Sequence, residues 1–178
     1  AASFLAKTQR DDGSWLPLWF GNQHAPNDTN PTYGTARVVL GLQELAERHV
    51  SLSARMPEKA RRWLLHAQNP DGSWGGCPKG PPSVEETALA VEALASLPCD
   101  GDTAAAVSAG VGWLMEKIES ADWRRPSPIG FYFAKLWYYE RLYPMIFTVA
   151  ALGRAQDCLA QSRQIKDPGS RRSAQVSP

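Results

Sequence analysis

The stretch that decides the fold is WLLHAQNPDGSW, which occupies residues 63–74. An aromatic and an aliphatic residue are followed, after three residues, by a glutamine, and a Gly-x-Trp sequence follows after three more. The same pattern occurs in FLAKTQRDDGSW, residues 4–15. The two copies share Gln9, Gly13 and Trp15 in the first and Gln68, Gly72 and Trp74 in the second. The Asp-Gly pair in each copy supplies the turn that ends a helix.

A third copy of this pattern has decayed. It begins at Trp113-Leu114, but Ile118 replaces the glutamine, and Trp123 comes one residue early without a glycine before it. A motif that returns along a chain is typical of repeat architectures, in which each copy is one supersecondary unit. We therefore expect stacked helical units.

The segments between the copies show the helical period. Apolar residues fall on one face at Val38, Val39, Leu42 and Leu45, at Val84, Ala88, Val91 and Leu94, and at Val107, Val111, Leu114 and Ile118. Ser83 followed by Glu86 has the form of a capping box, which starts a helix. No stretch alternates with period two. The sequence predicts an all-α fold of repeated helix pairs, either an α/α barrel or a solenoid.

This repeat resembles the QW motif, Gln-x-x-x-Gly-x-Trp, of the squalene-hopene cyclase and triterpene cyclase family. The resemblance implies that the glutamine and tryptophan stack and tie neighbouring outer helices together, so that the six motif residues have a structural role. It covers residues 1–154 and implies the carboxy-terminal part, perhaps half, of an (α/α)6 barrel. We expect residues 155–178 to hold a helix end and a polar, disordered tail from about residue 161.

Two further segments are similar to this family. Trp19 followed by Tyr33-Gly-Thr-Ala resembles a stretch whose Trp and Tyr face the cavity, although residues 20–32 are longer here. FYFAKLWYYERLY, residues 131–143, holds seven of the seventeen aromatic residues and resembles the carboxy-terminal aromatic segment. The resemblance implies cavity residues at Tyr132, Leu136 and Tyr139. Their spacing of three and four predicts one helix face, shared with Tyr143.

Membership of the family implies cyclisation of squalene or a related polyprenoid through cationic intermediates, which aromatic faces stabilise. The family starts the reaction with an Asp-x-Asp-Asp acid, and this motif does not occur in the chain. Asp11-Asp12 and Asp71 belong to the repeat turns, where a solvated or capping role is expected. We therefore identify no catalytic residue and expect the chain alone to be inactive without an upstream cyclase half.

Composition bears on which classes of partner the chain could bind. The formal net charge of +1 gives no basis for binding nucleic acid, and no run of about 20 apolar residues could cross a bilayer. The three cysteines predict reduced thiols in a cytoplasmic protein, with peripheral membrane contact in a complete cyclase. Exposed inner helices would favour a homodimer. We expect no metal and no cofactor.

Other classes stay open. A prenyltransferase β-subunit would need zinc ligands, but His66 and Cys77 have no Asp-x-Cys partner, and His24 and His49 have none at metal or triad spacing. A class I terpene synthase needs DDxxD, which Asp11-Asp12 does not complete. A non-catalytic α/α module that binds a lipid or a protein is the main alternative to the cyclase.

Overall fold

The computed structural model describes residues 2–48, 54–125, 127, 129–131 and 134–166. These segments are predominantly helical, as the sequence predicts. The helices are α1 (Ala2–Thr8), α2 (Pro31–Glu47), α3 (Arg55–Ala67), α4 (Val84–Ala95), α5 (Gly101–Glu119) and α6 (Tyr143–Lys166). Two short 3-10 turns, Pro26–Asp28 and Asp122–Arg124, and three short strands lie in the connections between them.

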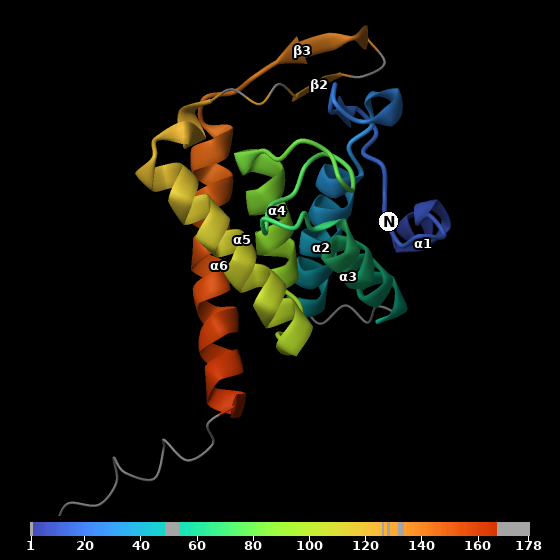
Figure 1. Ribbon diagram of the computed structural model, residues 1–178. Helices are drawn as coiled ribbons and strands as arrows, with labels where there is room; N and C mark the ends of the chain where they lie inside the picture. Colours follow the sequence, from blue (N-terminus) through green and yellow to red (C-terminus); the bar gives the residue numbers. More distant parts are fainter. Residues whose placement is uncertain (1, 49–53, 126, 128, 132–133, 167–178) are drawn as a thin grey trace, which may run out of the picture.

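The helices alternate between two rows (Figure 1). In one row α4 packs between α2 and α6, and in the other α3 contacts α5. Each helix of the second row also packs against the first, α3 on α2 and α5 on both α4 and α6. The long connections precede α2, α4 and α6, so they gather at one end of the molecule (Figure 1). The closed barrel stays a prediction, because the described helices form two adjacent rows that do not close into a ring.

The two repeat copies make the same hydrogen bonds to the following helix. The Gln9 side-chain amide donates to the carbonyls of Gly13 (2.9 Å) and of Met56 in α3 (3.0 Å). Gln68 donates in the same way to Gly72 (2.9 Å) and to Ala106 in α5 (3.0 Å). Each glutamine thus links the turn after its own helix to the next helix of the same row.

The tryptophans of the repeats complete the unit. The Trp15 indole N–H donates to the Leu5 carbonyl (2.9 Å), and the Trp74 indole donates to that of Leu64 (2.8 Å). The backbone N–H groups of both tryptophans donate to threonine hydroxyls, of Thr35 in α2 and of Thr87 in α4. Buried side chains with satisfied polar groups therefore join the two rows of helices.

A small three-stranded antiparallel sheet, which the sequence did not indicate, lies in the connections between the helices. It consists of β1 (Phe20–Gly21), β2 (Ile129–Phe131) and β3 (Leu136–Tyr138), in that order. Phe131 pairs with Phe20 on one side and with Leu136 on the other. The prediction that Leu136 and Tyr139 share a helix face with Tyr143 is therefore wrong, since Leu136 lies in a strand and α6 begins only at Tyr143. Strands of two and three residues are too short to show a period of two.

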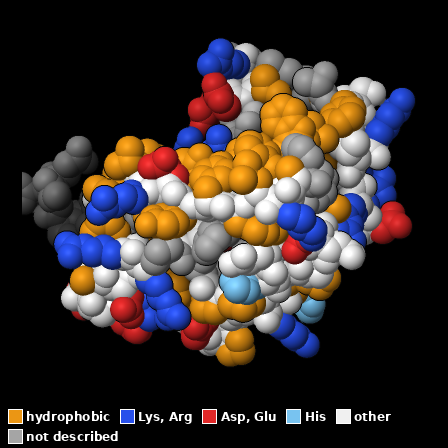
Figure 2. Space-filling view, turned by 90° about the horizontal axis from the view of Figure 1, so that it is seen from above, with side chains coloured by type: hydrophobic (Ala, Val, Ile, Leu, Met, Phe, Trp, Pro, Cys, Tyr) orange, Lys and Arg blue, Asp and Glu red, His pale blue; other side chains and the backbone are white. Residues whose placement is uncertain are grey.

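The end of the molecule above the sheet exposes apolar side chains. Figure 2 looks onto this end, where hydrophobic side chains gather into a broad patch. Around the sheet and the beginning of α6 the exposed apolar side chains are Leu18, Trp19, Leu136, Tyr139, Leu142, Met145, Ile146 and Val149. Exposed apolar patches of this kind mark surfaces that contact another molecule or another part of the same protein.

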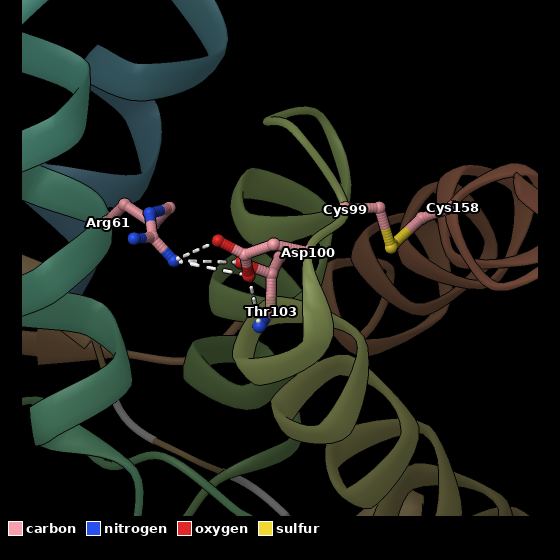
Figure 3. The surroundings of a disulfide bond; sticks show 5 residues. All are labelled: Arg61, Cys99, Asp100, Thr103 and Cys158. Carbon is pink, nitrogen blue, oxygen red and sulfur yellow. Dashed lines mark hydrogen bonds and ion pairs between the residues drawn. A yellow bond between two sulfur atoms is a disulfide. The ribbon is translucent and has the colours of Figure 1, made fainter. Parts of the chain in front are cut away.

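Two cysteines contradict the prediction of reduced thiols. Cys99, in the connection between α4 and α5, is joined by a disulfide to Cys158 of α6, with a Cα–Cα distance of 5.5 Å. Next to it Asp100 caps α5 by accepting from the Thr103 N–H (2.9 Å), and it pairs with Arg61 of α3 at 3.0 Å (Figure 3). Spacing along the sequence did not reveal the pair, because 59 residues separate the cysteines.

Helix α6 is longer than the sequence indicates. It continues to Lys166, so residues 161–166 of the expected tail are helical. Ala151, Ala155, Cys158 and Ser162 repeat at helical spacing and are buried, which explains why this polar stretch is held. The rest of the expected tail, residues 167–178, lies outside the described residues, and the domain division at residue 154 stays a prediction.

The packing of the repeat turn predicts that a methyl group added at Gly72 destabilises the fold. Gly72 has φ +89°, and a Cβ there would come within 2.8 Å of the Ala109 carbonyl oxygen. Gly72→Ala should lower the free energy of unfolding by about 1–3 kcal/mol, because it combines an unfavourable φ with a clash. Gly112→Ala is the matched control, since its Cβ would meet nothing within 4 Å inside α5. Urea unfolding should show the control unchanged or stabilised by up to ~1 kcal/mol; equal effects at both sites would contradict the packing described.

The disulfide predicts a redox-dependent stability. Reduction of the chain should lower its free energy of unfolding by roughly 2–4 kcal/mol, because the bond reduces the conformational entropy of the unfolded chain. Cys158→Ser should show the same loss without reductant and no further loss with it. Cys77→Ser is the control, because Cys77 is not bonded. If reductant leaves the wild-type unfolding curve in place, Cys99 and Cys158 are not joined in solution.

Candidate substrate-cavity wall

Aromatic side chains form a cluster at the end where the long connections meet. Phe20 packs against Tyr33 and Phe131, with ring centroids 5.1 and 5.8 Å apart. Phe131 in turn lies 6.2 Å from Tyr138. We call these four residues, together with Tyr143, the aromatic cluster. Tyr143 belongs to it as a close neighbour of Tyr138: burial, and next Tyr143, raise the pKa of the Tyr138 phenol.

Several elements build this cluster. Phe20, Phe131 and Tyr138 come one each from β1, β2 and β3, and the paired strands place the three rings along one face of the sheet. Tyr33 lies in the first turn of α2, and Tyr143 is the first residue of α6. Tyr143 also stacks on Phe147, with ring centroids 5.2 Å apart. The sheet thus covers the amino-terminal ends of two helices of the same row.

The residues predicted to line a cavity lie in different environments in the structure. Tyr33 is half-buried inside the cluster. Trp19 and Tyr139 are 58% and 53% exposed, and Leu136 is 57% exposed beside its strand partner Phe131. Tyr132 lies outside the described residues. Whether any of them lines a substrate cavity stays a prediction.

The aromatic residues that sequence reasoning missed are close neighbours of those it named. Phe20 follows Trp19, Phe131 precedes Tyr132, and Tyr138 precedes Tyr139. The sheet explains the difference: alternate residues of a strand share a face, so Phe131 and Tyr138 come together across β2 and β3, which helical spacing does not predict. The aromatic segment 131–143 does contribute to the cluster, and the cavity role of Tyr132, Leu136 and Tyr139 stays a prediction.

Two carboxyl groups lie at the start of α4, near the cluster end of the molecule. Glu86 is fully buried, and its Oε1 accepts from the side-chain amides of Asn22 (3.1 Å) and Asn30 (2.9 Å). The capping box is half confirmed: Ser83 accepts from the Glu86 N–H (3.0 Å), but the Ser83 N–H donates to the Trp74 carbonyl. The Glu86 carboxyl instead holds both ends of the 22–30 segment.

The environment of these carboxyl groups favours their neutral forms. Burial raises the pKa of Glu86, against the opposing effect of the hydrogen bonds from Asn30 and Asn22. Its second oxygen, Oε2, has no hydrogen-bond partner among the described residues. Burial, and next the neighbouring Glu86, raise the pKa of Glu85 to about 8. Glu85 is therefore largely protonated at neutral pH.

The aspartates of the repeat turns behave in the opposite way. Burial would raise the pKa of Asp12, but hydrogen bonds from the Ser14 N–H and hydroxyl outweigh it and lower the pKa below its ordinary value. Asp71 has a lowered pKa for the same reason, through Ser73. Both carboxyl groups are ionised at neutral pH and cap their turns, so they do not serve as proton donors.

In the part of the chain that the structure describes, no three His, Cys, Asp or Glu side chains come together where a metal ion could bind. None of its helices has the length and hydropathy that a bilayer crossing requires.

Comparison with known proteins identifies the family. The family model for the squalene-hopene cyclase C-terminal domain matches residues 1–157. The chain therefore belongs to this family of terpene cyclase domains.

Curated relatives agree with this assignment. A terpene cyclase–glycosyl transferase fusion protein from Humicola fuscoatra is 31% identical over 94% of this chain, which spans 13% of that protein. A squalene–hopene cyclase from Zymomonas mobilis is 29% identical over 82% of the chain and 23% of its own length. An ent-copalyl diphosphate synthase from a Streptomyces species is 30% identical over 83% of the chain and 25% of its own length. The chain thus spans a quarter or less of these relatives.

Solved structures share the fold. A type II terpene cyclase from Scytonema, in complex with geranylgeranyl dihydroxybenzoate, matches 88% of this chain and 49% of its own with a TM-score of 0.62 at 20% identity. An ent-copalyl diphosphate synthase from Streptomyces platensis matches 89% of this chain and 27% of its own, with a TM-score of 0.58 at 23% identity. The chain therefore shares its fold with part of each of these two proteins.

The carboxyl pair predicts a pH-dependent stability. Because the pKa of Glu85 and of Glu86 is higher in the folded chain than the ordinary value of 4.5, the free energy of unfolding should fall as the pH rises from about 4.5 to about 8. Glu85→Gln and Glu86→Gln should each become more stable relative to the wild type between pH 5 and pH 8. Glu119→Gln, exposed on α5, is the control and should follow the wild type.

Urea unfolding at pH 5, 6.5 and 8 measures this difference. If all three variants track the wild type in parallel, the two carboxyl groups are not buried as described.

Proposed function

We propose that this chain forms one wall of the substrate cavity in a type II terpene cyclase, and that the aromatic cluster stabilises cationic intermediates there. The observation that carries the proposal is the cluster itself: Phe20 packs against both Tyr33 and Phe131, where the sheet meets the start of α2. The negative faces of aromatic rings attract a cation by about 0.5–2 kcal/mol per contact, and they do not form stable bonds with it as an amine or a carboxylate would.

The exposed apolar patch supports a place within a larger cyclase. Leu142, Met145, Ile146 and Val149 make the beginning of α6 apolar on its exposed face. In a cyclase the amino-terminal part of the protein would cover this face and close the cavity. We infer that the initiating acid lies in that part, since the aspartates of the repeat turns are ionised. The substrate of the assembled enzyme would be squalene or a related polyprenoid.

A non-catalytic module is the second candidate. The same apolar patch could bind a second copy of the chain or a lipid. The observation that favours the cyclase is the burial of Glu86 with two asparagines beneath the aromatic end. A surface that only holds a partner has no need of a buried carboxyl group, which costs free energy.

The test joins residues 1–178 to the amino-terminal part of a squalene-hopene cyclase that carries Asp-x-Asp-Asp. Squalene and geranylgeranyl diphosphate are offered separately to the fusion and to the chain alone, and products are identified by gas chromatography and mass spectrometry. We expect cyclic product from the fusion only. Product from the chain alone would contradict the inference about the acid, and a folded fusion without product would favour the non-catalytic module.

Variants of the fusion test the aromatic cluster. Tyr33→Leu and Phe131→Leu should each lower the rate of product formation by about 2- to 30-fold, which corresponds to the loss of one cation–ring contact. Tyr33→Phe keeps the ring and should stay close to the parent. Phe4→Leu is the matched control, because Phe4 is exposed on α1. Equal rates in Tyr33→Leu and Phe4→Leu would exclude the cluster from the cavity.

A further inference from the structure

A buried hydrogen-bond network joins α4 to the two segments that carry Phe20 and Tyr33. Glu86 lies in the first turn of α4 and is buried, as are the two asparagines that donate to it, Asn22 and Asn30. Both asparagine amides donate to the same oxygen, Oε1. We call Glu86, Asn22 and Asn30 the Glu86 network.

The first arm of the Glu86 network holds the end of β1. Asn22 follows β1 directly, and Phe20 is the first residue of that strand. The Asn22 N–H also donates to the Asp28 carbonyl (3.1 Å). A Cβ at Gly76 would come within 2.6 Å of the Asn22 amide nitrogen, so glycine at this position lets the asparagine pack closely on the loop before α4. Asn22 is therefore fixed on both sides.

The second arm holds the first turn of α2. Asn30 is the N-cap of this helix, and its Oδ1 accepts from the Tyr33 N–H (3.0 Å) while its amide donates to Glu86. The next turn of backbone is held as well, since the Thr32 N–H donates to the Gly76 carbonyl (3.2 Å). Tyr33 is thus one asparagine side chain away from Glu86.

The contact between the two rings depends on how this connection is held. Phe20 and Tyr33 pack with centroids 5.1 Å apart and planes tilted by 48°. Between β1 and α2 the chain forms regular structure only in the 3-10 turn Pro26–Asp28, so its course is set by the contacts that it makes. Among the described residues, the side-chain hydrogen bonds from this connection to α4 are the two that end on Glu86.

The network needs an acceptor oxygen at this place more than it needs an acid. Oε1 accepts both hydrogen bonds, whereas Oε2 has no partner among the described residues. A glutamine could therefore keep both bonds with its carbonyl oxygen. A leucine would leave two buried amides without an acceptor, and the connection would then move toward water to satisfy them.

We propose that Glu86 is a positioning residue, which sets the distance between the Phe20 and Tyr33 rings and so the surface that they offer to a cationic intermediate. Its effect on the reaction rests on the proposed cyclase function, whereas the positioning is a property of this chain. The attraction between a cation and a ring is strong only within about 6 Å of the centroid, so a displaced ring loses it.

Nuclear magnetic resonance of the 178-residue chain tests the positioning. Tyrosine rings are labelled with carbon-13, and Tyr33→Phe identifies the Tyr33 signal. Phe20→Leu defines where this signal lies without the neighbouring ring, because an aromatic ring shifts the signals of protons next to it. We expect Glu86→Leu to move the Tyr33 signal most of the way to that position. Glu86→Gln should leave it near the wild-type value.

Two further variants separate positioning from a general loss of stability. Asn22→Ala removes only the arm that holds β1 and should move the Tyr33 signal in the same direction, even if Glu86→Leu does not fold. Val107→Ala destabilises the core from α5, which takes no part in the network, and should leave the signal in place. The proposal is overturned by a signal that Asn22→Ala leaves unmoved, or that Val107→Ala or Glu86→Gln moves as far as Phe20→Leu does.

The fusion enzyme measures the consequence for the reaction. Glu86→Leu should lower kcat by about 2- to 30-fold, which corresponds to one weakened cation–ring contact, and leave KM unchanged. Glu86→Gln should stay close to the parent. In a Phe20→Leu background, Glu86→Leu should have little further effect on kcat, because it acts through that ring. Equal kcat in Glu86→Leu and the parent, or fully additive losses in the double variant, would exclude this role.

The two measurements fail independently. A folded parent fusion without product would reject the cyclase, and the Tyr33 signal would still decide whether Glu86 positions the rings. An active parent fusion together with an unmoved Tyr33 signal would keep the cyclase and reject Glu86 as its positioning residue.

Discussion

The hydrogen bond from a glutamine side chain to a carbonyl of the next helix is the interaction on which this fold depends. Gln9 reaches Met56 in α3, and Gln68 reaches Ala106 in α5. Helix pairs of a repeat protein contact only their neighbours, so the connection between one pair and the next decides whether they stack. A glutamine amide satisfies a turn carbonyl and a helix carbonyl at once, and glycine at the turn lets the backbones approach.

The repeat turns also set the position of the end of the molecule that carries the aromatic cluster. Trp15 and Trp74 fix the turns against Thr35 in α2 and Thr87 in α4, so the two connections that lead to α2 and α4 start from defined points. From there Asn22 and Asn30 fold back onto Glu86, and β1 pairs with β2. The aromatic end is thus a consequence of the structural motif, although none of the motif residues belongs to it.

The sequence allowed the helices, the repeat and the capping of α4 to be predicted, because each leaves a local or periodic pattern. The sheet left none, since its strands are only two and three residues long, so the contact between Phe131 and Tyr138 was not predicted. The bond between Cys99 and Cys158 and the asparagine contacts of Glu86 join residues far apart in the chain. Such contacts depend on the tertiary arrangement, which spacing in one sequence does not encode.

The separation of charge at the aromatic end has a chemical logic. A carbocation survives only where nucleophiles and water are kept away from it, and rings can surround it without reacting. Ionised carboxylates near the cluster would capture the cation or its proton early. The raised pKa of Glu85 keeps this group largely protonated at neutral pH, and burial favours the neutral form of Glu86.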